Sequence, residues 1–180
     1  MSIRLAAAAL LAPLLLTCLV APRVTPAAVF LETSVESVAR ASDAVVRGRV
    51  VSRSSFFTQD RRTILTEVVV EVAEAWKGTP GERVRMIVPG GRVGDLAQRV
   101  DAAPGFADGE EVVVFLSRRG GFFELNGLAI GKFRVEGGEA VPELGNILFQ
   151  GPAVKAGERR VGAMPFEELR RRVAGAGVER

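Results

Sequence analysis

Alternation of apolar and polar residues is the feature that most constrains what this chain folds into. Val46, Gly48 and Val50 fall on one face of an extended segment, and Arg47 and Arg49 fall on the other. Successive side chains of a β-strand point to opposite faces, so the alternation predicts a strand with one buried face. The glycine at an inward position predicts a sharp bend, as small barrels require.

The same period recurs along the chain, and turn residues separate the segments that carry it. We predict strands over 44–52, 64–76, 83–88, 111–116, 122–126 and 129–135. In the second strand, the residues expected on the inward face are Thr66, Val68, Val70, Val72 and Trp76. Glycine and proline clusters at 77–81 and 89–91 favour tight turns. The nearly continuous apolar run 111–116 is typical of a central strand.

Two further segments give less direct patterns. The alternation in 129–135 predicts that the odd-numbered residues face in and that Ile130, Lys132 and Arg134 face out. The segment 95–100 fits either one helical turn or a short strand.

A short helix is predicted at each end of the β region. Thr33 and Glu36 have the spacing of a capping box, with Thr33 as the N-cap of a helix that runs to about Arg40. The C-terminal helix is expected from Pro165 to Val173, with glutamates near its positive end and arginines 170–172 near its negative end.

These elements indicate a mainly β fold. We expect a small OB-like antiparallel barrel of five to six strands, with a short N-terminal helix and a C-terminal helix. The expected division of the chain is a signal peptide over 1–28, the OB-like barrel over 29–138, a loop over 139–163, and the C-terminal helix and tail over 164–180.

The first 28 residues have the pattern of a secretory leader. Arg4 precedes an apolar run over 5–20, and the expected cleavage point lies near Ala27 or Ala28. The run is shorter than the ~20 residues that span a bilayer, and Pro13 interrupts it. We therefore predict export to the periplasm or the extracellular space, with no transmembrane span after cleavage.

Histidine is absent from the chain, and Cys18 is its only cysteine. Leu15-Leu16-Thr17-Cys18 resembles a lipobox, so a lipid anchor on Cys18 is the alternative to a free exported form. Beyond the leader, no Ser–His–Asp or Cys–His arrangement and no usual zinc site can form. We therefore predict no catalytic residue, no cofactor and no metal site, in a protein that is not an enzyme.

Carboxylates are the remaining groups that could transfer protons. Glu110 and Glu111 are neighbours on a strand, so their side chains point to opposite faces. The adjacent pair Glu167 and Glu168 suits the start of a helix. A carboxylate-dependent hydrolase stays open as an alternative function.

Outward arginines and nearby aromatic residues form the candidate partner surface. Its members are Arg47, Arg49, Arg53, Phe56, Phe57, Arg83, Arg85 and Arg92. The loops near Phe56, over 89–94 and over 105–108 are expected to form its rim. An OB-like barrel offers such a face to another protein, or alternatively to an anionic oligosaccharide or oligonucleotide.

Cross-strand ion pairs are the competing explanation for these arginines. If the hairpin turns near residue 60, Arg49 falls opposite Glu71 and Arg53 falls opposite Glu67. The formal net charge is only +3, and two of the arginines lie in the leader. A nearly neutral domain lacks the concentrated basic footprint of a general nucleic-acid binder.

The series of strands and turns resembles a known group of proteins. The segments that carry the likeness are DAVVRGRVVS, VEVAEAWKG, VPGG, GFADGEEVVVFL and GLAIGKFRV. They resemble uncharacterised exported bacterial proteins with an OB-like barrel, which are distantly similar to the netrin-type domains of metalloproteinase inhibitors. The resemblance covers about residues 33–135 and the terminal helix, and it implies a fold rather than an activity. Those inhibitors chelate the protease zinc with an N-terminal cysteine, which the predicted mature chain lacks.

The function expected from these observations is that of an exported, non-catalytic binding or interaction module. Its expected partner is another exported protein.

Overall fold

The computed structural model describes residues 28–145, 147–151 and 154–177, so the predicted leader and Cys18 lie outside the described residues, apart from Ala28. The fold is mainly β. The strands are β1 (Ala28–Leu31), β2 (Ala44–Phe57), β3 (Ile64–Lys77), β4 (Arg83–Pro89), β5 (Gly91–Val93), β6 (Leu96–Gln98), β7 (Glu111–Arg119), β8 (Phe122–Leu125), β9 (Lys132–Glu136), β10 (Glu139–Pro142), β11 (Ile147–Gln150) and β12 (Met164–Pro165). The helices are α1 (Val35–Ala41) and α2 (Phe166–Ala176), and η1 (Leu128–Gly131) is a 3₁₀ helix.

Most strands belong to one large mixed sheet. Its order is β12-β10-β9-β7-β2-β3-β4-β8, and β8 also pairs with β7. Neighbouring strands run antiparallel except β4 and β8, which are parallel. This parallel pair corrects the prediction of an all-antiparallel arrangement. Residues 90–121 separate β4 from β8, and a parallel pair requires a long connection of this kind.

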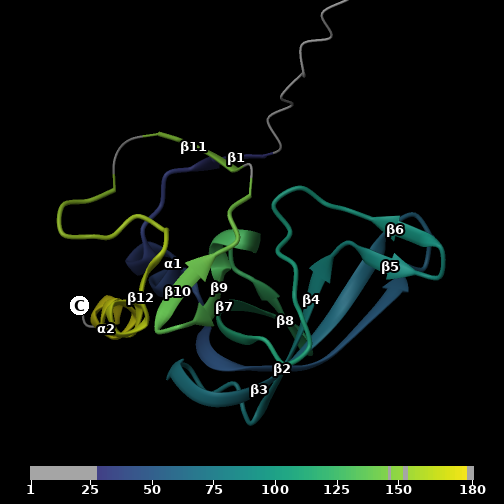
Figure 1. Ribbon diagram of the computed structural model, residues 1–180, viewed down its shortest axis with the longest axis horizontal. Helices are drawn as coiled ribbons and strands as arrows, with labels where there is room; N and C mark the ends of the chain where they lie inside the picture. The colour runs from purple at the N-terminus through teal and green to yellow at the C-terminus, as the bar shows by residue number, and fades with distance from the viewer. Residues whose placement is uncertain (1–27, 146, 152–153, 178–180) are drawn as a thin grey trace, which may run out of the picture.

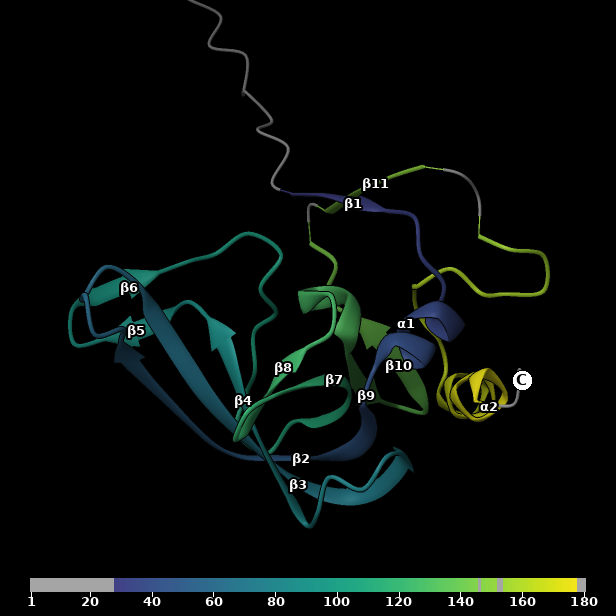
Figure 2. The ribbon, with the colours of Figure 1, turned by 180° about the vertical axis from the view of Figure 1, so that it is seen from behind.

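Two smaller sheets lie outside the large one. β1 and β11 pair in parallel, and β5 and β6 form an antiparallel pair. Figure 1 and Figure 2 show α1 and α2 at one end of the molecule and β5 and β6 at the other, beside the turn between β2 and β3. Residues 139–163, predicted as a loop, contain β10 and β11. β10 pairs with the preceding β9 across a tight turn, and β11 pairs with β1, which is remote in sequence. The segment 95–100 contains a short strand, β6.

Two buried clusters of apolar side chains lie on opposite faces of β2 and β7. Val113 and Phe115 of β7 join the cluster beneath the helices, whereas Val112, Val114 and Leu116 join the cluster shared with β3, β4 and β8. The helices contribute Val35, Val38, Leu169 and Val173 to the first cluster. β7 is therefore buried on both faces, which explains why its sequence is continuously apolar instead of alternating.

The register of β2 against β3 matches the prediction over only part of its length. Arg49 lies opposite Glu71 as expected, but Arg53 lies opposite Val68 instead of Glu67. An irregularity between Val50 and Ser52 adds one residue to β2 and shifts every later pair by one position.

Further irregularities near the other end of this pair change which face Trp76 occupies. The register shifts between Val45 and Val46 and again between Arg47 and Gly48. Trp76 consequently packs against the cluster beneath the helices, while Val68 and Val70 fill the other cluster. The prediction that Trp76 shares a face with these valines is therefore wrong, because period-two counting fails across a bulge. Gly48 is buried as predicted, and a Cβ there would overlap the carbonyl oxygen of Glu71.

Helix α1 begins one residue later than the capping-box pattern predicts. Ser34 is the N-cap in place of Thr33, and its Oγ accepts a hydrogen bond from the Ser37 backbone N at 3.0 Å. Glu36 does not close a capping box, since its carboxylate accepts a hydrogen bond from the Arg159 backbone N. Thr33 and Ser34 both carry a hydroxyl that can cap a helix. The residue after Ser34 contacts a distant segment, because the Val35 backbone N donates to the Arg159 carbonyl oxygen at 2.9 Å.

Helix α2 extends beyond the predicted end at Val173 to Ala176, with Pro165 as its N-cap. Arginines 170–172 therefore lie in the middle of the helix, and the helix has no basic residue in its last turn. The two glutamates of the first turn, Glu167 and Glu168, stand where the helix dipole favours them, as predicted.

Candidate functional site

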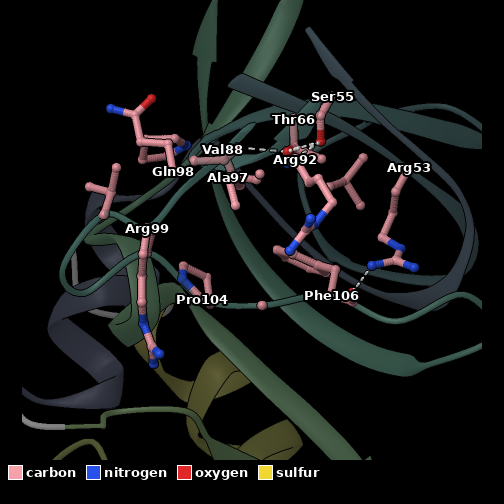
Figure 3. Close-up of a pocket in the computed structure, with 17 residues that line it drawn as sticks. Arg53, Ser55, Thr66, Val88, Arg92, Ala97, Gln98, Arg99, Pro104 and Phe106 are labelled. Carbon is pink, nitrogen blue, oxygen red and sulfur yellow. Dashed lines mark hydrogen bonds between the residues drawn. The ribbon is translucent and has the colours of Figure 1, made fainter. Parts of the chain in front are cut away.

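A pocket of about 670 Å³ lies where β2, β3 and β4 meet the segment 89–106 (Figure 3). We call it the arginine pocket, because Arg53, Arg92 and Arg99 line it from three separate parts of the chain. Its apolar lining consists mainly of Val68, Val88, Pro89, Val100, Pro104 and Phe106. The pocket therefore combines guanidinium groups with a surface suited to an apolar side chain.

A chain of hydrogen bonds holds β5 against β2 and β3 at the edge of the pocket. Thr66 Oγ1 donates to the Gly90 carbonyl oxygen at 2.7 Å, and the hydroxyls of Thr66 and Ser55 are 2.9 Å apart. Because Thr66 has already used its only hydroxyl proton, Ser55 is the donor between them. The Arg92 backbone N donates in turn to Ser55 Oγ at 3.4 Å. This chain places Arg92 at the pocket.

Glycine is required at the turn that carries Arg92. Gly91 has a φ of 133°, and a Cβ there would overlap the hydroxyl oxygens of Ser55 and Thr66. Gly90, with a φ of 91°, makes the same turn in the left-handed region. The glycine pair read from the sequence as a turn thus also permits a close approach between β5 and the β2–β3 pair.

Arg53 is partly neutralised at the pocket, whereas Arg92 and Arg99 are not. Arg53 Nε donates to Asp108 Oδ1 at 2.8 Å, and Arg53 also donates to the Phe106 carbonyl oxygen. The hydrogen bond from Arg53 lowers the pKa of Asp108 below its usual range. Arg92 and Arg99 are exposed, and their side chains form no ion pair within the part of the chain that the structure describes.

A buried lysine holds one wall of the pocket. Lys132 has no exposed surface, and its Nζ lies 2.8 Å from Glu110 Oε1 and 3.6 Å from Glu143 Oε2. The same ammonium donates to the Gly105 carbonyl oxygen and lies 4.4 Å from the ring centre of Phe106. The wall at residues 105 and 106 is thus attached to β9 through charged hydrogen bonds and a cation–π contact.

The burial of Lys132 contradicts the prediction that it faces outward. Residues 128–131 form η1 instead of a strand, so the alternation predicted for 129–135 does not hold there. Ile130, also expected outside, is buried, whereas Arg134 is exposed as predicted. A 3₁₀ turn replaces the first half of the strand and brings Lys132 beneath the loop that carries Glu110.

The other arginines of the predicted surface form ion pairs or contact the main chain. Arg47 bridges Glu74 and Glu111, and its guanidinium lies 5.1 Å from the ring centre of Phe166. Arg49 donates to the Gly109 carbonyl oxygen at 2.8 Å. Arg47 and Arg49 therefore stabilise contacts away from the arginine pocket.

Two arginines on β4 form exposed ion pairs across the sheet. Arg85 lies 2.5 Å from Glu67, and Arg83 lies 3.8 Å from Glu71. The cross-strand pairing considered in the sequence analysis thus occurs, although its partners come from β4 instead of β2.

The two aromatic residues at the predicted rim lie near the end of β2 and do not line the arginine pocket. Phe56 is exposed, and Phe57 is half-buried with the guanidinium of Arg61 at 5.5 Å from its ring centre. Of the eight predicted surface residues, Arg53 and Arg92 are brought together at the arginine pocket.

Arg99 and Lys132 are parts of this site that no sequence pattern indicated. Arg99 follows a short strand with weak alternation, and no local pattern connects it to Arg53. Lys132 falls at an outward position of the predicted alternation, so the sequence pattern indicated an exposed lysine. The loop 105–108 is one of the rim segments expected from the sequence, and Gly105 and Phe106 line the pocket.

The lining of the arginine pocket offers hydrogen-bond donors to an anion. Among the described residues that line it, none carries a carboxylate, thiol, imidazole or amine. The guanidinium groups and the Gln98 amide supply hydrogen-bond donors to an anion.

A second hollow, of about 440 Å³, lies on the other side of residues 105–107 and is lined by glutamates. Each of these carboxylates contacts a cation: Glu110 and Glu143 contact Lys132, Glu111 contacts Arg47, and Glu136 contacts Arg134. Within residues 28–145, 147–151 and 154–177, no group of three acidic side chains is arranged to hold a metal ion.

Comparison with protein-family models finds no match to this chain, and comparison with curated proteins finds none either. No helix in the described ranges has the length and apolar character needed to cross a membrane.

Proposed function

We propose that this chain is an exported, non-catalytic binding module built on an OB-like barrel, and that its arginine pocket binds an acidic segment of another exported protein. The observation that carries the proposal is the pocket itself. Arg92 and Arg99 stand exposed beside an apolar surface, without carboxylate partners among the described residues.

Strand pairing supports the barrel part of the proposal. Hydrogen-bonded pairs connect β7 to β2, β2 to β3, β3 to β4, β4 to β8 and β8 to β7. All five strands contribute buried side chains to one cluster, which includes Val46, Val68, Met86, Val114 and Phe123. An OB-fold is a five-stranded, partly open barrel of this kind that binds ligands on a strand face and adjoining loops.

Charge distribution favours a local acidic segment over a long polyanion. Arginines on β2 and β4, such as Arg47, Arg83 and Arg85, already contact glutamates. These pairs reduce the positive charge that β2 and β4 offer to a phosphate or sulfate backbone. The pocket also contains a single aromatic side chain, Phe106, whereas single-stranded nucleic acids require several stacking partners.

The amino-terminal sequence supports the export part of the proposal. Arg4, the apolar run over 5–20 and the small residues near Ala28 have the order of a cleavable leader. Mass spectrometry of the mature amino terminus tests it directly. A free amine near Ala28 agrees with cleavage, a lipid on Cys18 indicates the anchored form, and an intact leader contradicts export by this route.

Paired arginine variants test the binding site. The mature protein is titrated with a fluorescent glutamate-rich peptide, and Arg92→Ala/Arg99→Ala is compared with Arg83→Ala/Arg85→Ala, which removes the same charge away from the pocket. We expect the first variant to weaken binding at least about tenfold, which corresponds to about 1.4 kcal/mol, and the second to change it by less than about twofold.

Three results would contradict the proposal. Equal weakening by both variants would mean that the peptide responds to overall charge and not to the pocket. A second contrary result would be that heparin or single-stranded DNA binds more tightly than the peptide and that Arg92→Ala/Arg99→Ala abolishes this binding. The site would then bind an anionic oligosaccharide or oligonucleotide, which is the alternative function. Absence of any binding at low salt would reject the pocket as an anion site.

A further inference from the structure

The arginine pocket has its apolar lining between groups of positive charge. Figure 3 shows Arg53 on one side of the pocket and Arg99 on the other, with Val88, Pro104 and Phe106 between them and Arg92 beside Phe106. A ligand that only carried negative charge would leave this apolar surface uncovered.

The apolar lining is available to a ligand because it is incompletely covered by the protein. Pro89, Val100 and Phe106 are half-buried, although Val88 and Pro104 are buried. Removing apolar surface from water is favourable, so an apolar side chain placed here adds affinity that no charged group supplies.

The wall that carries Phe106 is held firmly enough to present a defined surface. Lys132 and Arg53 both donate hydrogen bonds to main-chain carbonyl oxygens of this wall, at Gly105 and Phe106 respectively. The Gly105 backbone N in turn donates to Glu143 Oε2 at 3.1 Å. A wall fixed from both sides loses less conformational entropy when a ligand binds.

We propose that the pocket recognises an extended acidic–apolar–acidic segment, in which one large apolar side chain covers the half-buried Phe106 while flanking carboxylates contact Arg99 beyond Pro104 and Arg92 beside Phe106. The inference rests on the proposed function, because it specifies the sequence of the acidic segment. Its chemical basis is the complementarity of charge at both ends and of apolar surface in the middle.

Three short peptides test this pattern on the mature protein. The first has a central phenylalanine flanked on each side by glutamates, the second has serine in place of the phenylalanine, and the third has glutamines in place of the glutamates. We expect the first to bind at least about tenfold more tightly than either of the others, because each of those lacks one of the two contributions.

Variants of the pocket identify where the apolar side chain binds. Phe106→Ala should remove most of the advantage of the phenylalanine peptide over the serine peptide, and Phe56→Ala, an exposed aromatic outside the pocket, should leave that advantage unchanged. Circular dichroism checks that Phe106→Ala folds. If it does not fold, Val100→Ser makes the same test at another half-buried position of the lining.

The outcomes separate this inference from the proposed function. Equal binding of the phenylalanine and serine peptides, both lost on Arg92→Ala/Arg99→Ala, would overturn the apolar requirement and leave the anion site in place. Failure of every glutamate peptide to bind would overturn both. Equal binding of the glutamine peptide would show that charge plays no part.

Discussion

The Lys132 ammonium lies 2.8 Å from Glu110 Oε1, and neither side chain is more than 8% exposed. A buried ion pair of this kind is costly to break, because the remaining charge loses its partner in a place that water hardly reaches. The pair also joins two segments that have separate roles, since Lys132 belongs to β9 and Glu110 precedes β7 beside the pocket wall.

Removal of the lysine is the first prediction. Lys132→Ala should lower the free energy of unfolding by about 3–5 kcal/mol, the usual result when one partner of a buried pair is deleted. Arg134→Ala on the same strand is the control, because its ion pair with Glu136 is exposed and should contribute less than about 1 kcal/mol. Urea denaturation measures both.

A double variant identifies the cause of that loss. Lys132→Met/Glu110→Gln removes both charges and keeps similar volumes, so it should be more stable than Lys132→Ala. Hydrogen exchange should nevertheless increase at residues 105–107 in both variants, because the contact with the Gly105 carbonyl oxygen is gone. A loss below about 1 kcal/mol in Lys132→Ala would contradict the assignment of a strong buried pair.

A pair of glycine substitutions should change stability in opposite directions. A Cβ at Gly48 would overlap backbone atoms of Glu71, so Gly48→Ala should destabilise the fold by more than about 1 kcal/mol. Gly175 lies in α2 with open space around it, so Gly175→Ala should stabilise the protein by roughly 0.5–1 kcal/mol. Thermal melting of the two variants against the parent checks both signs, and a neutral Gly48→Ala would refute the close approach of β2 and β3.

Acid should destabilise the protein through Glu158. Hydrogen bonds from Ser34 and Arg40, each at 2.5 Å, hold the pKa of the Glu158 carboxyl below its usual value of 4.5. A carboxyl whose pKa is lower in the folded state stabilises the fold above the unfolded value, and this contribution is lost as the pH falls through the folded value.

The expected pH profile follows from that sign. Melting temperature should vary little between about pH 5.5 and 8, since the chain has no histidine to titrate there, and should fall below about pH 5. Glu158→Gln should flatten part of the acid limb, whereas Glu139→Gln, at an exposed position, should not. Identical acid limbs in the parent and in Glu158→Gln would show that Glu158 does not contribute.

Local sequence patterns predicted elements best where each strand has one simple environment. The strand that contains Val84, Met86 and Val88 was predicted with its inward face, and all three side chains are buried. The central position of β7 followed from its continuous apolar run. In both cases the burial of apolar surface determines the structure of the strand. The order of apolar and polar residues indicates that burial directly.

The candidate site was harder to predict because it gathers residues that are distant along the chain. Turn residues indicated the segment that carries Arg92, and the loop that carries Phe106 was expected at the rim. Their meeting with Arg53 and Arg99 depends on how β5 crosses β2 and β3, which no local period encodes.

Taken alone, the sequence determined the mainly β character, the approximate positions of six of the twelve described strands and of both α-helices, and the absence of histidine throughout the chain. Only the tertiary structure decided the bulges that moved Arg53 and Trp76, the burial of Lys132 and the parallel pairing of β4 with β8. The physical reason is range: alternation reports the environment of neighbouring residues, whereas register, ion pairing and pocket shape depend on contacts between segments that meet only after the chain has folded.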